Sequence, residues 1–111
     1  MADPNDICEA MKMEAFFVFY YQARDAYRRV LNSSEVLQQD YASQVALEEL
    51  LSQAYTSYEK AVNRSSYAYM CKYEGGTESD YLDLMGEALS YLAESQLYSK
   101  RLIAQLSYYE K

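Results

Sequence analysis

Residues 81–109 read YLDLMGEALSYLAESQLYSKRLIAQLSYY, and apolar or small side chains return there in alternating steps of four and three residues. This spacing places them on one stripe of an α-helix, as in the seam of a coiled coil. The members of the stripe are Tyr81, Met85, Ala88, Leu92, Ser95, Ser99, Leu102, Leu106 and Tyr109. Leu89 on one side and Tyr98 on the other widen it, so we expect this helix to contact two other helices.

The preceding segment, residues 34–73, repeats the pattern and contains no Gly or Pro, so we expect one helix about 60 Å long. Its stripe is formed by Leu47, Leu51, Ala54, Tyr58, Ala61, Ser65 and Ala68. The weakest point of this helix is residues 63–66, Asn-Arg-Ser-Ser, because Asn and Ser side chains compete with helical hydrogen bonds. Small residues recur in both stripes, which predicts close packing between the two helices.

A third stripe lies in the N-terminal segment and consists of Phe16, Phe19, Ala23, Ala26 and Val30. Capping residues predict a helix start at Asp3-Pro4, and chain reversals are predicted at residues 32–35 and at Gly75-Gly76. The sequence therefore predicts one all-α domain over residues 1–111. We expect an up-down-up three-helix antiparallel bundle with coiled-coil-like seams and a long central helix, with helices at about 4–31, 34–73 and 78–110.

Composition limits the classes of function. The chain has 111 residues, of which 50% are hydrophobic and 24% charged, as in a globular domain. Seventeen acidic residues against ten basic ones give a net charge of −7, which disfavours nucleic acid and anionic membranes as partners. The first residues lack the basic region and apolar segment of a signal peptide, so we expect a cytoplasmic protein.

Residue types that support catalysis or metal binding are scarce. The chain has no His, which removes the commonest general base and the commonest transition-metal ligand. Cys8 and Cys71 are too few for an ordinary zinc site, and the predicted helices hold them about 20 Å apart, so two free thiols are expected. The acidic residues within 74–83 lack the ligand spacing of an EF-hand. We therefore expect no enzymatic activity, metal, cofactor or small-molecule substrate.

An apolar run at residues 16–21, FFVFYY, is not explained by a helix that faces the bundle on one side only. At about 100° per residue, six consecutive helical residues point in every direction around the helix. Met11, Phe17, Val18 and Tyr21 lie off the N-terminal stripe, so we expect another protein chain to bury them. The alternative is that the surplus length of the second helix covers them inside the domain.

Tyrosine is the dominant aromatic residue, with 14 Tyr against three Phe and no Trp. A Tyr side chain packs its ring while its hydroxyl stays in water, and protein interfaces favour it. Tyr55 and Tyr91 lie at the edges of the stripes, where packing within the bundle explains them. Tyr67, Tyr73, Tyr108 and Tyr109 have no comparable packing role.

Two hypotheses for the function follow from these patterns. The first is a non-enzymatic protein–protein interaction module, namely an adaptor, a small secretion-type chaperone or an assembly subunit, which binds a partner protein or self-associates as a homo-oligomer. The alternative is an acidic inhibitor or nucleic-acid-mimicking decoy that blocks a basic site on a target protein, such as a phage-encoded antagonist. The acidic segment 74–83 favours the decoy, but basic residues interrupt the acidic surface elsewhere, at Lys60, Arg64, Lys100 and Arg101.

Overall fold

The computed structural model describes the backbone of residues 4–110 and the side chains of residues 19–110. This part of the chain is almost entirely helical and contains no strand, which confirms the predicted all-α class. Its elements are α1 (Pro4–Ser33), α2 (Glu35–Gln39), α3 (Tyr41–Tyr73), α4 (Glu78–Leu106) and a short 3₁₀ turn, η1 (Ser107–Tyr109). None of the described helices is both long and apolar enough to cross a membrane.

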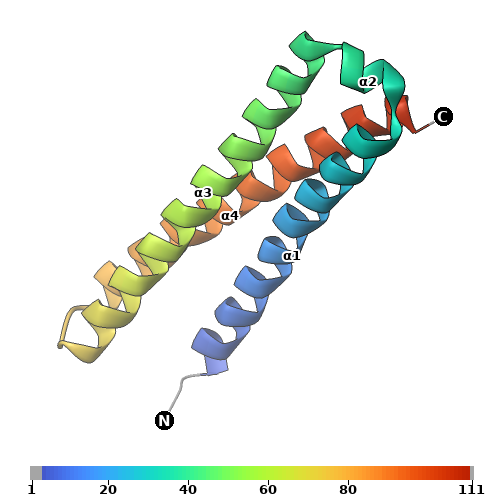
Figure 1. Cartoon of the computed structure of the whole chain (residues 1–111). Coiled ribbons are helices and arrows are strands. Elements are labelled where there is room, and N and C mark those ends of the chain that lie inside the picture. The colour runs from blue at the N-terminus through green and yellow to red at the C-terminus, as the bar shows by residue number, and fades with distance from the viewer. Residues whose placement is uncertain (1–3, 111) are drawn as a thin grey trace.

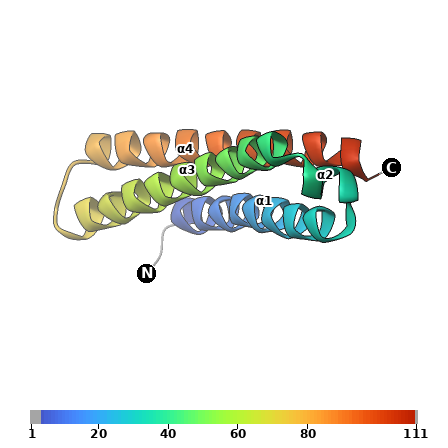
Figure 2. The same ribbon diagram turned by 45° about the horizontal axis from the view of Figure 1, so that its top comes forward.

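Helices α3 and α4 form a hairpin and share the most extensive contact in the molecule (Figure 1). Helix α1 lies alongside the hairpin, mainly against α4, and touches α3 less. Figure 2 shows the end of α1, the start of α3 and the end of α4 at the same end of the molecule, next to α2. The result is an elongated domain of 56 × 22 × 15 Å, in which a third long helix is added to a helical hairpin.

The helix predicted over residues 34–73 is broken at Asp40, so the prediction of one uninterrupted helix is wrong. A side chain caps the start of each of the two resulting helices, and Asp40 does so at the break itself. Ser34 Oγ accepts a hydrogen bond of 3.2 Å from the backbone N–H of Leu37. Asp40 accepts bonds from the hydroxyl of Ser43, at 2.6 Å, and from its backbone N–H, at 3.1 Å, and these bonds lower the pKa of the Asp40 carboxyl.

The short helix α2 is anchored by Leu37, whose side chain is fully buried. It belongs to a core cluster drawn from all four helices, together with Ala23, Tyr27, Val30, Leu47, Leu102 and Leu106. Two glutamine amides satisfy carbonyl groups near the helix ends: Gln38 donates to the Leu31 carbonyl at 2.8 Å, and Gln44 donates to the Leu37 carbonyl at 2.9 Å. The chain reversal after α1 is therefore closed by polar side chains and one apolar anchor, without glycine.

Residues 63–66 continue α3 without a break, although their helix propensity is low. Ser65 is buried, and its hydroxyl donates a hydrogen bond of 3.0 Å to the carbonyl of Val62 in the preceding turn. Arg64 forms an ion pair with Glu87 of α4, with a nitrogen–oxygen distance of 3.0 Å. Contacts with α4 thus outweigh the local preferences of Asn and Ser.

The hairpin turn ends α3 at residue 73 and starts α4 at residue 78, as predicted. Gly75 has a φ of 82°, a conformation that favours glycine, and the Gly76 N–H donates a bond of 2.7 Å to the carbonyl of Cys71. Thr77 caps α4 by accepting a bond of 3.1 Å from the N–H of Asp80. The Cys71 thiol beside this turn is free, whereas the Cys8 side chain lies outside the described residues.

The predicted stripes match most of the buried residues of α3 and all of those of α4. Every buried residue of α4 belongs to its stripe, and the end members Tyr81 and Tyr109 are half-buried. The Ser95 hydroxyl of α4 donates a hydrogen bond of 2.7 Å to the backbone carbonyl of Ala54 in α3. A serine side chain is short, so this bond requires the two backbones to lie close together. This agrees with the close packing expected from the small residues.

Replacing Ala61 by Leu is expected to lower the free energy of unfolding by about 1–3 kcal/mol. Ala61 is fully buried in α3, and three further carbon atoms would force the helices apart. Ala46 lies on an exposed side of the same helix, so Ala46→Leu should change stability by less than about 0.5 kcal/mol. Urea denaturation followed by circular dichroism compares the two variants, and equal losses would contradict close packing at Ala61.

Candidate interaction surface

The predicted interaction residues all lie on α1, but only Tyr21 is among the described side chains. The other three, Met11, Phe17 and Val18, fall outside them. Tyr21 exposes 37% of its surface. Its ring meets the edge of the Tyr20 ring, with centroids 5.5 Å apart, and the Arg24 guanidinium lies 4.5 Å from the Tyr21 ring centroid. Tyr21 is therefore at the surface, and its aromatic and basic neighbours hold it in place.

Tyr21 belongs to a group of four tyrosines that we call the tyrosine cluster: Tyr20 and Tyr21 of α1, and Tyr55 and Tyr58 of α3. The buried Tyr20 ring lies 5.4 Å from the Tyr55 ring, measured between centroids. The Tyr55 hydroxyl donates to the Glu59 carboxylate, which raises the pKa of Tyr55. The pKa of Tyr58 is raised mainly by burial and to a smaller extent by the nearby Tyr21. The cluster thus combines packed rings with hydroxyls that reach polar groups.

A second contact joins α1 to α3 closer to the chain reversal. The Tyr27 hydroxyl donates a hydrogen bond of 2.9 Å to Glu48 Oε1. Burial of Tyr27, together with this bond and the negative charge of Glu48, raises the pKa of the Tyr27 hydroxyl to about 12. Tyrosine side chains therefore form much of the link between α1 and α3, where the two helices share little backbone contact.

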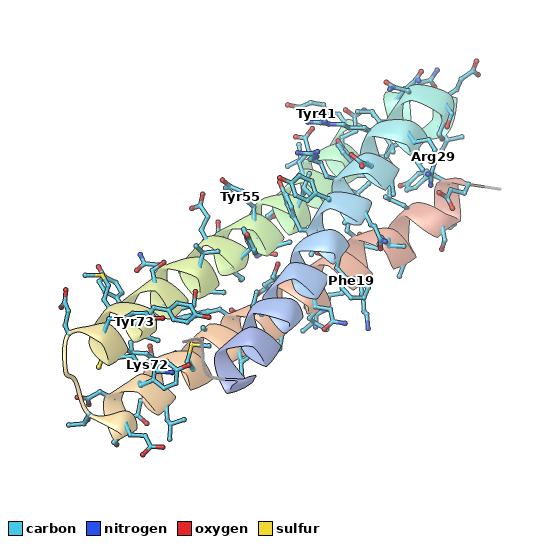
Figure 3. All side chains as sticks on the ribbon, turned by 90° about the horizontal axis from the view of Figure 1, so that it is seen from below. Phe19, Arg29, Tyr41, Tyr55, Lys72 and Tyr73 are labelled. Atoms are coloured by element: carbon cyan, nitrogen blue, oxygen red, sulfur yellow. The ribbon has the colours of Figure 1, made fainter. Side chains whose placement is uncertain are left out.

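Further contacts of α1 are made with α4 and with Glu110, which follows η1. The Lys100 ammonium of α4 lies 5.4 Å from the ring centroid of Phe19, which Figure 3 shows on the side of α1 that faces α4. Near the other end of α1, Arg29 forms an ion pair with Glu110, with a nitrogen–oxygen distance of 3.1 Å. These contacts occupy the sides of α1 that face the hairpin, and they leave Tyr21 at the boundary with solvent.

The acidic residues around the hairpin turn do not form a metal site. Their side chains are all exposed to solvent: Glu74, Glu78, Asp80 and Asp83. Among the side chains that the structure describes, no three potential metal ligands lie close enough together to hold an ion. These carboxylates instead form a solvated negative patch, and two of them, Glu78 and Asp80, stabilise the start of α4 through its helix dipole.

The sequence analysis placed Tyr58 in the stripe of the second predicted helix and Tyr55 at its edge, and it connected neither residue with Tyr21. The spacing of these tyrosines in the sequence is the feature that could have indicated the cluster. Tyr55 and Tyr58 lie one turn apart on α3, and Tyr20 and Tyr27 lie one heptad apart on α1. Whether these residues meet depends on where α2 places α1 relative to α3. The break at Asp40, which was not predicted, lies between these two helices in the chain.

No protein-family model, curated protein or solved structure matches this chain.

Proposed function

We propose that this protein is a non-enzymatic protein–protein interaction module that serves in the cytoplasm as an adaptor, a small chaperone or an assembly subunit. The observation that carries this proposal is the exposure of the tyrosine cluster: Tyr21 and Tyr55 expose 37% and 44% of their surfaces at the boundary of α1 and α3. Tyrosines held at the surface of a rigid scaffold supply much of the binding energy in protein interfaces.

The proposed interface continues along α1 from the tyrosine cluster to Met11, Phe17 and Val18, which lie on the same helix within ten residues of Tyr21. A second copy of the chain or another protein would cover these residues. In this proposal the three long helices act as one up-down-up bundle with coiled-coil-like seams. The bundle provides the fixed spacing that allows several aromatic side chains to engage one partner surface at the same time.

Replacing Val18 by Glu and Tyr21 by Lys is expected to leave the domain helical and to weaken association at least about tenfold. Neither residue belongs to the α1 stripe, and the change places charges against an apolar partner surface. Sedimentation equilibrium measures the association, and circular dichroism measures the helix content. The matched control makes the same chemical changes at Val36 and Tyr108, which expose 66% and 68% of their surfaces, and should keep the wild-type association.

Two results of this experiment would contradict the proposed interface. A helical variant with unchanged association would show that Val18 and Tyr21 do not contact a partner. An unfolded variant would show that they belong to the core of the domain, as in the alternative in which α3 covers them.

An acidic inhibitor that blocks a basic site on a target protein is the second candidate. It is favoured by the exposed carboxylates at the hairpin turn, Glu74, Glu78, Asp80 and Asp83. The nearest basic residue on α3 is Lys72, and its ammonium lies 5.2 Å from the ring centroid of Tyr81. A protein of this kind would compete with DNA for its target, and changing these carboxylates to amides would abolish the competition.

A further inference from the structure

Among the described residues, α3 carries more large exposed apolar or aromatic side chains than any other helix. They lie on its outer face, which points away from α4. They are Tyr41, Val45, Tyr55, Tyr67, Met70 and Tyr73, and their exposed fractions range from 44% to 76%. Figure 3 shows Tyr41, Tyr55 and Tyr73 one after another along the helix. We call this set, with the carboxylates between its members, the α3 outer face.

Carboxylates alternate with the apolar groups along this face. Glu48 and Glu49 lie between Val45 and Tyr55 in the sequence, and Glu59 follows Tyr55 by one turn; all three are exposed. Glu49 and Glu59 are ten residues apart, which corresponds to about 15 Å along the helix. The face therefore carries negative charge at two positions along the helix axis, which we call the two acidic levels. The ring of Tyr55 lies between them, and apolar groups lie beyond them at both ends.

The basic residues of α3 all contact α4 instead of this face. Lys60 lies 5.6 Å from the ring centroid of Tyr91, Arg64 lies 3.0 Å from the carboxylate of Glu87, and Lys72 lies 5.2 Å from the ring centroid of Tyr81. Figure 3 shows Lys72 on the side of α3 that is next to α4. The charged groups of these three residues therefore lie toward α4, while aromatic rings and carboxylates of α3 lie on its outer face.

We propose that the α3 outer face binds a basic amphipathic helix of a partner protein. This assignment rests on the proposed function in protein binding and names the chemistry of the partner. Apolar side chains of the incoming helix would pack on the Val, Met and Tyr groups, while its Lys or Arg residues would pair with the carboxylates and stack on the Tyr rings. Basic residues spaced about ten positions apart on the partner would match the two acidic levels.

The same chemistry already occurs inside the domain. Among the side chains of residues 19–110, basic groups lie over aromatic rings in these pairs: Arg24 over Tyr21, Lys60 over Tyr91, Lys72 over Tyr81 and Lys100 over Phe19. A second copy of the chain fits the face poorly, because two outer faces would bring like charges together. Nucleic acid is disfavoured for the same reason, given the net charge of −7.

The test uses a synthetic helical peptide as the probe, with Leu along one side and Lys at positions ten residues apart beside that side. A second peptide with Glu in place of Lys serves as its control. The full-length protein is expected to bind the Lys peptide at least about tenfold more tightly than the Glu peptide in isothermal titration calorimetry. Equal binding of both peptides, or no binding of the Lys peptide, would overturn the proposal.

Two protein variants with equal changes in charge locate the binding site. The first variant alters the α3 outer face by combining Glu49→Gln, Glu59→Gln and Tyr67→Ser. It is expected to weaken binding of the Lys peptide at least about tenfold. The second variant makes matched changes elsewhere by combining Glu78→Gln, Asp83→Asn and Tyr108→Ser. It should weaken binding of the Lys peptide less than about twofold. Since all six residues are exposed, both variants should remain folded, and circular dichroism checks this.

Equal losses in the two variants would mean that the peptide responds only to the total charge. A larger loss in the second variant would place the site outside the α3 outer face. Either result refutes the assignment to α3. The Val18→Glu and Tyr21→Lys variant separates this assignment from the proposed function. It should lose association but keep peptide binding. If the peptide fails to bind while this variant still loses association, the α3 assignment is wrong and the proposed function stands.

Discussion

Replacing Leu37 by Ala is expected to lower the free energy of unfolding by about 2–5 kcal/mol, which is a large part of the stability of a domain of this size. Leu37 is the one buried residue of α2, a helix of five residues that has little stability of its own. Its side chain is fully buried in the cluster that includes Tyr27 and Leu47, so its removal leaves a cavity where α1, α3 and α4 meet.

Urea denaturation of the Leu37→Ala variant measures this loss. The neighbouring residue Val36 exposes 66% of its surface and provides the matched control, because Val36→Ala should cost less than about 0.5 kcal/mol. Similar losses in the two variants would show that α2 is not anchored through Leu37. The comparison therefore tests the one helix that the sequence did not predict.

Stability is expected to fall by about 2–3 kcal/mol between pH 10 and 12 because of Tyr27 alone. The pKa of Tyr27 is raised from 10.0 to about 12 in the folded domain, mainly by burial and then by Glu48. A raised pKa means that the folded state favours the neutral hydroxyl. Its stabilising contribution is therefore complete below the unfolded pKa of 10.0 and is lost as the pH rises through about 12.

The measurement is the free energy of unfolding in urea at several values of pH across this window. Tyr27→Phe cannot ionise, so its stability should fall less steeply than that of the wild type. Tyr55 and Tyr58 also have raised pKa values and add to the remaining slope. Tyr41 exposes 76% of its surface, and the Tyr41→Phe control should keep the wild-type slope. A wild-type slope in Tyr27→Phe would show that Tyr27 ionises equally well in both states.

The periodic parts of the fold were predictable from the sequence. The stripe of α4 matches the buried residues because the burial of apolar side chains decides the orientation of a long helix. The hairpin turn was predictable from Gly75 and Thr77. Gly75 has a positive φ and Thr77 caps α4, and each of these features depends on a single residue. The break at Asp40 was not predicted because the segment contains no Gly or Pro, although Asp40 and Ser43 have the spacing of a helix cap.

Other features depend on contacts between distant residues and leave little trace in a single sequence. Helix propensity marked residues 63–66 as weak, but the ion pair of Arg64 with Glu87 and the burial of Ser65 hold that segment in α3. The tyrosine cluster requires α1 and α3 to lie at a certain distance, which α2 determines. Of the predicted interface, Tyr21 is described and exposed. The prediction for Met11, Phe17 and Val18 remains a prediction.

The tyrosine cluster also gives the protein an intrinsic spectroscopic probe. The rings of Tyr20, Tyr21 and Tyr55 lie within 5.5 Å of a neighbouring ring, and they are held by two different helices. Aromatic rings fixed in an asymmetric arrangement give a near-ultraviolet circular dichroism signal, which disappears when side-chain packing is lost while helices persist. Because the chain has no Trp, tyrosine dominates this signal. Docking of α1 on α3 can therefore be followed optically, without a label and separately from helix content.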